Sequence, residues 1–239
     1  VYPERLTVKS KARLIAAAYQ RRDRDDQREE QTERTTKTLR LGPNGTLALG
    51  NIAGDIVITR GGGSDTTVEI VKTARGRDVN DAKELLALVV VDATERAGRA
   101  DVRTRYPSGE DARRRDRRNI NVTVAYNVTA PAGTRIAAES ISGSIRVTDI
   151  KGDVTASSVS GNVRISGASR VGSAKSISGT VEILDSQLDG GVEASSVSGD
   201  VLLRRVHARR INAGSVSGHL KIEEAQSERI SASTTSGAV

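Results

Sequence analysis

The chain has 239 residues, with 37 basic and 30 acidic side chains, and therefore a formal charge of +7. It contains no Cys, Met, Trp or Phe, and its aromatic side chains are four tyrosines. The absence of Cys excludes disulfides, thiolate nucleophiles and Cys-ligated zinc or iron–sulfur centres. A core must therefore be built from Val, Ile, Leu and Ala. No run of about 18 apolar residues occurs, so no helix is expected to span a membrane.

Residues 1–35 are predicted to form a basic, charged N-terminal arm. Its apolar stretch Leu14–Tyr19 follows three basic residues and resembles the core of a signal peptide, but it is shorter than the roughly 7–15 residues of such a core. A short helix or strand is the alternative interpretation. Because the chain does not begin with Met, we expect a processed N-terminus from which a signal peptide has been removed. The mixed-charge run Asp23–Arg34 is expected to be either a solvent-exposed helix or disordered.

Residues 36–135 are predicted to contain a diverged first coil of a repeat, one short helix and several longer strands. The stretch Leu47–Ile58 places apolar residues around Gly54 at the positions that the regular repeat uses further along the chain. It is therefore predicted to be the first coil. Val68 and Ile70 alternate with polar residues and predict a following strand.

A helix is predicted over Asp78–Leu88, because apolar residues recur there at helical spacing and Asp78 suits the N-cap position. Two strands, at residues 89–95 and 100–106, are expected to follow, with a short turn around Gly98. The Arg-rich segment 107–118 is predicted to be a loop. Residues 119–130 alternate cleanly between apolar and polar side chains, so a strand is expected there before the turn at Pro131.

Residues 136–239 contain an internal repeat, S-[IV]-S-G, whose glycines are spaced by 18, 18, 20, 19 and 19 residues; the last copy is the looser T-T-S-G. With the glycine as position 0, an alanine stands at −5 in all six copies, and aliphatic residues stand at +2 and +4. The motif glycines, together with that of the diverged first coil, are Gly54, Gly143, Gly161, Gly179, Gly199, Gly218 and Gly237. The alanines are Ala138, Ala156, Ala174, Ala194, Ala213 and Ala232.

The period predicts an all-β fold, a parallel β-solenoid with coils of about 18–20 residues. Side chains alternate along a strand, so positions −7, −5 and −3 share one face, and positions 0, +2 and +4 share a face of the next strand. The chain must therefore turn inside the motif. Glycine suits this corner either through a positive φ or through close approach of two backbones.

Three further expectations follow from stacking such coils. Ser and Thr at −3 and −1 are predicted to form hydrogen bonds along the stack. The connection between +4 and the next −7 varies in length and is expected to tolerate insertions. A thin coil has no room for an aromatic ring in every layer, which accounts for the lack of aromatic residues after Ile136.

The order of these segments resembles the bacterial putative-adhesin domain of unknown function with β-strand repeats. The resemblance rests on the N-I-x-G-D-I-x-I opening, the small helix, the strand that ends before Pro131 and the serial S-x-S-G-x-V coils, and it covers about residues 36–239. It implies a β-helix-like fold that is extracellular or belongs to the cell envelope. It implies no catalytic residues.

The main enzymatic alternative is a carbohydrate-active β-helix enzyme, which needs carboxylates clustered on one strand face. Asp149, Asp185 and Glu224 all stand at +6 and are the candidates, although they lie in the variable connection, where solvated charge is the simpler interpretation. No Ser recurs together with His and Asp as a nucleophilic triad would require. The Gly-Gly-x-Gly-x-Asp calcium repeat does not occur. No catalytic residue, metal or cofactor is therefore predicted.

The positive charge is concentrated in the first half of the chain. Residues 136–239 carry 11 basic and 11 acidic side chains, so the whole excess belongs to residues 1–135. The candidate contacts to an anionic surface polymer are Arg113, Arg114, Arg115, Arg117 and Arg118. A solvated loop is the alternative interpretation. No aromatic residues are interleaved with these arginines, so nucleic acid is not an expected partner.

The sequence thus predicts a non-enzymatic, exported β-solenoid that acts as a structural or adhesive element of the cell surface. Self-association is expected, because an open coil end can pair with another strand. The coil ends or the N-terminal arm would then stack copies head to tail into a fibre. The alternatives are the carbohydrate-active enzyme and a polyanion-binding module that uses the Arg-rich segments.

Overall fold

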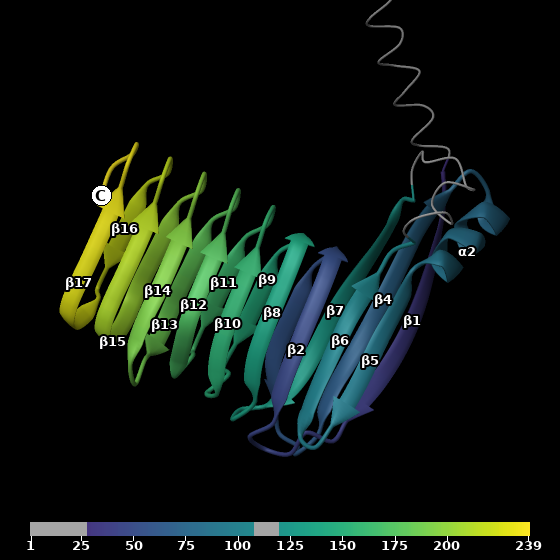
Figure 1. Ribbon diagram of the computed structural model, residues 1–239, viewed down its shortest axis with the longest axis horizontal. Helices are drawn as coiled ribbons and strands as arrows, with labels where there is room; N and C mark the ends of the chain where they lie inside the picture. Colours follow the sequence, from purple (N-terminus) through teal and green to yellow (C-terminus); the bar gives the residue numbers. More distant parts are fainter. Residues whose placement is uncertain (1–27, 108–119) are drawn as a thin grey trace, which may run out of the picture.

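The computed structural model describes residues 28–107 and 120–239. Within these residues the fold is all-β with one short helix, α2 (Val79–Leu88). The strands stack side by side along one long axis, with the regular coils at one end and α2 at the other (Figure 1). This arrangement agrees with the solenoid-like fold expected from the repeat.

The regular coils pair equivalent positions in parallel. Ala156 lies between Ala138 and Ala174 of the neighbouring coils, and Val163 lies between Ile145 and Val181. The register is therefore the one that the repeat predicts, except at Gly172, where a shift in β12 places Val171 opposite Val154. The strands are β8 (Arg135–Ser142), β9 (Ile145–Thr148), β10 (Asp153–Ser158), β11 (Val163–Ser166), β12 (Arg170–Ser176), β13 (Val181–Gln187), β14 (Gly191–Ser196), β15 (Val201–Ser215), β16 (Leu220–Glu223) and β17 (Gln226–Thr234).

The diverged copy around Gly54 lies directly beside the first regular coil. Leu47 lies opposite Ile136, and Ile56 lies opposite Ile145, both in parallel pairs. The strands of the N-terminal half are β1 (Glu29–Leu39), β2 (Thr46–Ala53), β3 (Ile56–Gly61), β4 (Thr66–Gly76), β5 (Val90–Arg96), β6 (Arg99–Arg105) and β7 (Val122–Pro131).

Beyond this first coil the pairing is mixed, so a uniformly parallel solenoid is too simple a description. β6 and β7 pair in parallel with β2 and β3, but β5, β4 and β1 are added in antiparallel order. The turn at Ala97 and Gly98, both with positive φ, joins β5 directly to β6. A connection that short permits only antiparallel pairing.

The charged run at residues 29–34 is a strand, and the prediction of a helix or disorder was wrong for these residues. β1 pairs along its whole length with β4, and charges of opposite sign face each other. Glu30 forms an ion pair with Arg75 at 2.8 Å, and Arg34 forms one with Glu69 at 3.2 Å. Such cross-strand pairs stabilise a sheet edge, but they are invisible in the local composition.

The predicted helix is present and is capped as expected. The Asp78 carboxylate accepts a hydrogen bond from the Asp81 backbone N–H at 2.8 Å, which satisfies one of the free donors at the helix N-terminus. Ala82 and Leu86 are buried, and the helix packs beside β4 and β1. It therefore covers part of the N-terminal end of the stack.

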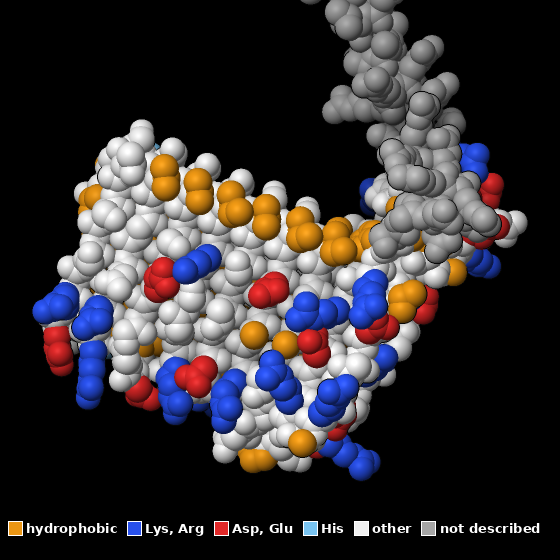
Figure 2. All heavy atoms as spheres, viewed as in Figure 1, with side chains coloured by type: hydrophobic (Ala, Val, Ile, Leu, Met, Phe, Trp, Pro, Cys, Tyr) orange, Lys and Arg blue, Asp and Glu red, His pale blue; other side chains and the backbone are white. Residues whose placement is uncertain are grey.

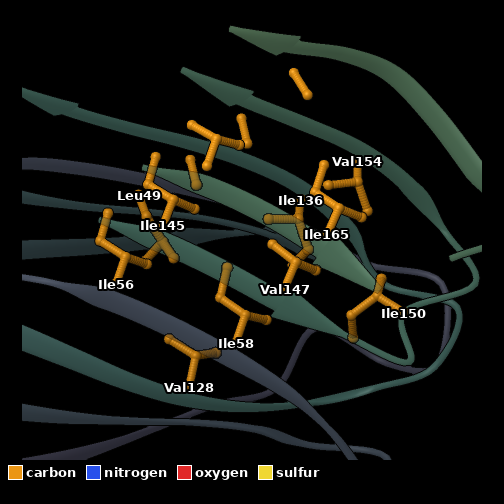
Figure 3. Packing of buried hydrophobic residues seen from close by; sticks show 14 of the residues in the cluster. Leu49, Ile56, Ile58, Val128, Ile136, Ile145, Val147, Ile150, Val154 and Ile165 are labelled. Atoms are coloured by element: carbon orange, nitrogen blue, oxygen red, sulfur yellow. The ribbon is translucent and has the colours of Figure 1, made fainter. Parts of the chain in front are cut away.

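The core is a set of aliphatic ladders inside the coils. Figure 3 shows Ile136, Ile145 and Ile165 packed in the same interior as Leu49 and Ile58. A further buried ladder, at +7, is not predicted by the repeat because it lies in the variable connection; its members are Ile150, Ala168, Ser186 and Val206. The alanines at −5 are buried in five of six coils, whereas Ala232 in the last coil is exposed.

The motif glycines lie where consecutive backbones come into close contact. At Gly161 an added Cβ would lie 2.2 Å from the Gly143 carbonyl oxygen, and at Gly179 it would lie 2.1 Å from that of Gly161. Gly161 and Gly179 do not have positive φ, in contrast to Gly54 with φ +112 and Gly237 with φ +159. Close backbone approach is therefore the reason for glycine in the regular coils.

A second corner lies at +6, where the backbone is left-handed. The φ angles are 59 at Asp149, 65 at Gly167, 49 at Asp185, 53 at Arg205 and 50 at Glu224. The candidate carboxylates therefore occupy a tight turn, a conformation that Asp tolerates better than most residues. The left-handed backbone at this turn therefore explains why carboxylates recur at +6.

Tyr126 shows where the fold accepts an aromatic ring. Its side chain is fully buried in β7, and its hydroxyl forms a hydrogen bond with that of Thr104. Thr104 in turn donates to Asn51 Oδ1 at 2.9 Å, and Asn51 Nδ2 donates to the Val124 and Gly54 carbonyls. The ring thus lies in the wider N-terminal half, with its polar end satisfied.

We expect Gly161→Ala to lower the free energy of unfolding by about 2 kcal/mol or more, because its Cβ would displace the Gly143 backbone. Gly190→Ala is the matched control, since a Cβ there meets no atom within 4 Å. Urea unfolding of both variants measures the difference. Equal stability of the two variants would contradict the close-approach role of the motif glycine.

Burial raises the pKa of Tyr126 to about 12, whereas a tyrosine in an unfolded chain titrates near 10. The folded state holds this proton more tightly, so the stability it contributes is present below about pH 10 and is lost between about pH 10 and 12. We expect the unfolding midpoint of Tyr126→Phe to fall less steeply over that range than that of the wild type. Parallel profiles of the two proteins would show that the Tyr126 proton makes no such contribution.

Candidate interaction site

One outer surface of the stack carries a continuous row of exposed aliphatic side chains. We define the aliphatic row by its five members at position −2, Ile141, Val159, Ile177, Val197 and Val216. They are between 42% and 52% exposed. Parallel strands lie about 4.8 Å apart, so the row is about 19 Å long. Figure 2 shows it as the orange line that crosses the coils just below the motif corner.

A buried hydroxyl beside each of these residues fixes their direction. The Ser176 hydroxyl donates to the Gly161 carbonyl of the preceding coil at 2.9 Å and accepts from the Gly179 N–H at 2.9 Å. The same hydroxyl-to-carbonyl bond recurs at Ser158, Ser196, Ser215 and Thr234. Because position −3 points inward, position −2 must point outward. The predicted hydroxyl ladder is thus found at −3, with backbone acceptors, while the serines at −1 are exposed.

Ser140 is the exception to this pattern. Its expected acceptor, the Gly54 carbonyl, already receives a hydrogen bond from Asn51 Nδ2 at 2.8 Å. The buried Ser140 hydroxyl therefore has no hydrogen-bond partner among the described residues. A buried polar group in that state costs stability.

We define the lateral face as the outward side chains at −6, −4 and −2 of the coils from β2 to β15. Most of those at −6 and −4 are small, including Ala137, Thr155, Ser157 and Ser195. Lys175 forms an ion pair with Glu193 at 2.9 Å. Glu139 forms no ion pair with a described residue. The face is therefore flat and carries few charges.

A shallow hollow of about 340 Å³ lies at the N-terminal end of the lateral face. It forms because Gly50 leaves a gap between the side chains of Arg103 and Glu139, and Ile141 and Val159 line its other side. The pKa of Arg103 is raised chiefly by its hydrogen bond and charge interaction with Asp101, and to a smaller extent by the charge of Glu139. The hollow continues the aliphatic row.

The other outer surface, formed by the strands that carry +1, +3 and +5, is more highly charged. Arg164 pairs with Glu182 at 3.1 Å, and Lys221 pairs with Glu223 at 2.7 Å. Glu223 has a lowered pKa, chiefly because Lys221 donates a hydrogen bond to it. The two outer surfaces thus differ in chemistry.

The candidate carboxylates do not form a cluster. Along the +6 ladder, Gly167 separates Asp149 from Asp185, and Arg205 separates Asp185 from Glu224. Arg205 forms a hydrogen-bonded ion pair with Asp185, which lowers the pKa of that carboxyl group. Within residues 28–107 and 120–239, no group of three His, Cys, Asp or Glu side chains is placed to hold a metal ion. This arrangement does not favour the enzymatic alternative.

The predicted polyanion contacts Arg113, Arg114, Arg115, Arg117 and Arg118 lie outside the described residues. The basic stretch Val1–Arg24 also lies outside them, and so does Leu14–Tyr19. The polyanion-binding hypothesis therefore stays a prediction. In the described part of the chain, no helix is long and apolar enough to cross a membrane.

The aliphatic row was present in the sequence but was not recognised as a surface. Ile or Val at −2 belongs to the repeated motif, and the alternation of side chains along a strand places −2 opposite to the buried −3. The row can therefore be identified from the sequence, because an apolar residue recurs in successive coils at a position that points outward.

Stacked coils, aliphatic ladders and close-contact glycines define a β-solenoid-like repeat protein. The chain belongs to the Toastrack DUF4097 family, whose model matches residues 47–239, and this agrees with the resemblance found in the sequence. No curated protein matches the chain.

Three solved structures are similar to parts of the fold at low identity. A putative cell adhesion protein from Clostridium sporogenes has 11% identity and a TM-score of 0.38, over 86% of this chain and 100% of that one. A putative adhesin from Bacteroides fragilis has 16% identity and a TM-score of 0.37, over 87% and 97%. A putative lipid binding protein from Parabacteroides distasonis has 10% identity and a TM-score of 0.39, over 87% and 97%.

We expect Ser140→Ala to leave the stability unchanged or to raise it by up to about 1 kcal/mol, because it removes a buried hydroxyl without a partner. The matched variant Ser176→Ala should lower the stability by about 1–2 kcal/mol, because it removes two hydrogen bonds. Urea unfolding compares the two. A larger loss at Ser140 than at Ser176 would contradict this account of the corner.

Proposed function

We propose that the protein is a non-enzymatic, exported element of the cell surface, and that it acts adhesively through its lateral face. The observation that carries the proposal is the aliphatic row, in which five branched side chains about half exposed lie at equal spacing. Soluble proteins rarely expose contiguous apolar surface unless it binds something. A repeated contact also lends itself to multivalent binding.

A purely structural role is the alternative to binding for the aliphatic row, because branched side chains in adjacent strands also stabilise one another. Two features support a binding role beside it. The flanking side chains are small and mostly uncharged, which leaves the row accessible, and the opposite outer surface carries charged residues at the corresponding places. The exported location is part of the proposal and rests on the family resemblance.

We place the contact on the side of the stack in preference to its ends. The strand at the N-terminal edge, β1, is antiparallel and rich in charged residues, a composition that natural proteins use to protect edge strands. Head-to-tail stacking into a fibre stays a prediction.

The proposal is tested with beads coated with the purified protein and incubated with bacterial cells. We expect Val159→Lys and Val197→Lys, singly and together, to reduce adhesion, with the double variant retaining about a tenth or less of the wild-type level. The control is Leu202→Lys, which introduces the same charge in place of a partly exposed aliphatic residue on the opposite surface.

Circular dichroism and unfolding midpoints confirm that the variants are folded. Adhesion that is insensitive to both lateral-face lysines would contradict the proposal. Turnover of any member of a glycan panel by the wild-type protein would contradict its non-enzymatic part.

A further inference from the structure

We infer that the lateral face binds a second copy of this chain, with the two stacks antiparallel and a two-fold axis at the coil of Val159. The inference rests on the proposed function, because it names the partner of the same face. Its basis is the pattern of charges on the lateral face, together with the size and shape of that face.

The area favours a weak contact between many copies. Three outward rows over the five coils of the aliphatic row cover an area of about 24 by 13 Å, roughly 300 Å² on each partner. A stable interface of standard size buries about 800 Å² per partner. One pair of lateral faces would therefore associate weakly and reversibly, and many copies arrayed on a surface would bind through avidity.

The shape suits two sheets packed face to face. The outward residues near the centre are Thr155, Ser157 and Ser173, which are small enough for a second sheet to approach closely. Face-to-face sheets pack about 10 Å apart. Of the two ways to place one stack on another, only the antiparallel one brings the two aliphatic rows together, because a parallel arrangement sets each row against the −6 side of its partner.

Charge selects the register. With the axis at Val159, Ile141 of one copy lies opposite Ile177 of the other. Glu139 then lies opposite Lys175, and symmetry repeats this pair. If the axis moves one coil toward the N-terminus, Glu139 lies opposite Glu139 of the other copy. If it moves one coil toward the C-terminus, Lys175 lies opposite Lys175 of the other copy. The central register is the one that gives two attractive pairs, in which Lys175, paired with Glu193 within its own copy, also meets Glu139 of the other copy.

The charge pattern gives a direct test by analytical ultracentrifugation of the full chain. Glu139→Lys and Lys175→Glu should each weaken self-association about tenfold or more, because each creates like-charge contacts across the two-fold axis. An equimolar mixture of the two variants should recover association, since the mixed pair has two Lys–Glu contacts. The control Arg146→Glu changes charge on the opposite surface and should have no effect.

Cysteine cross-linking tests the register itself, because the chain has no Cys of its own. Val159→Cys lies on the proposed axis and should form a disulfide-linked dimer under mild oxidation. Val216→Cys has similar exposure, 46% against 42%, but lies three coils from the axis. Its two copies would be about 29 Å apart, so it should remain monomeric.

Three outcomes would overturn the inference. These are a monomer at about 1 mM, self-association that the mixed charge variants do not recover, and equal cross-linking at both cysteine positions. Vesicles of zwitterionic lipid test whether the lateral face binds a lipid surface instead of a second copy. Binding to them that is lost in Val159→Lys, without self-association, would assign the face to a lipid surface. If bead adhesion persists while self-association fails, the proposed function stands and this inference fails.

Discussion

The close approach of successive backbones at the motif corner is the constraint on which the rest of the structure depends. A glycine whose Cβ position lies 2.2 Å from the preceding carbonyl, as at Gly161, allows neighbouring coils to stack at strand spacing. A serine at −3 then reaches that carbonyl with its hydroxyl. The corner is thus fixed by one missing side chain, which recurs in every regular coil, and by one short hydroxyl, whose bond to the carbonyl recurs in every regular coil except that of Ser140.

This constraint determines what the interior can hold. The thin coils enclose only small and aliphatic side chains, so alanine and Val, Ile or Leu form ladders, and residues 136–239 contain no aromatic ring. Among the described residues, the one fully buried ring is that of Tyr126, and it lies in the N-terminal half on β7, which pairs with the long antiparallel strand β4. Its hydroxyl is satisfied by Thr104 and, through it, by Asn51. Asn51 in turn occupies the acceptor that Ser140 would have used.

The same stacking also shapes the outer surfaces. Each outward position becomes a row with a fixed spacing, so a residue type repeated in the sequence becomes a linear surface. The aliphatic row and the charged rows on the opposite surface are therefore two consequences of one geometry. A partner that matches such spacing is most simply another copy of the same stack, which is why the arrangement of Glu139 and Lys175 is informative.

The sequence by itself determined the repeat, the register of the coils apart from Gly172, the capped helix at Asp78 and the diverged copy of the motif at Gly54, because each depends on local spacing. Only the tertiary structure decided the strand β1, since its charges are compensated by Arg75 and other residues some 40 positions away. It alone also decided the left-handed corner at +6 and the buried +7 ladder, because both lie in connections of variable length that periodicity does not describe. The outward direction of the aliphatic row follows from alternation along the strand, but its formation as one continuous surface requires the stacking of coils far apart in the chain.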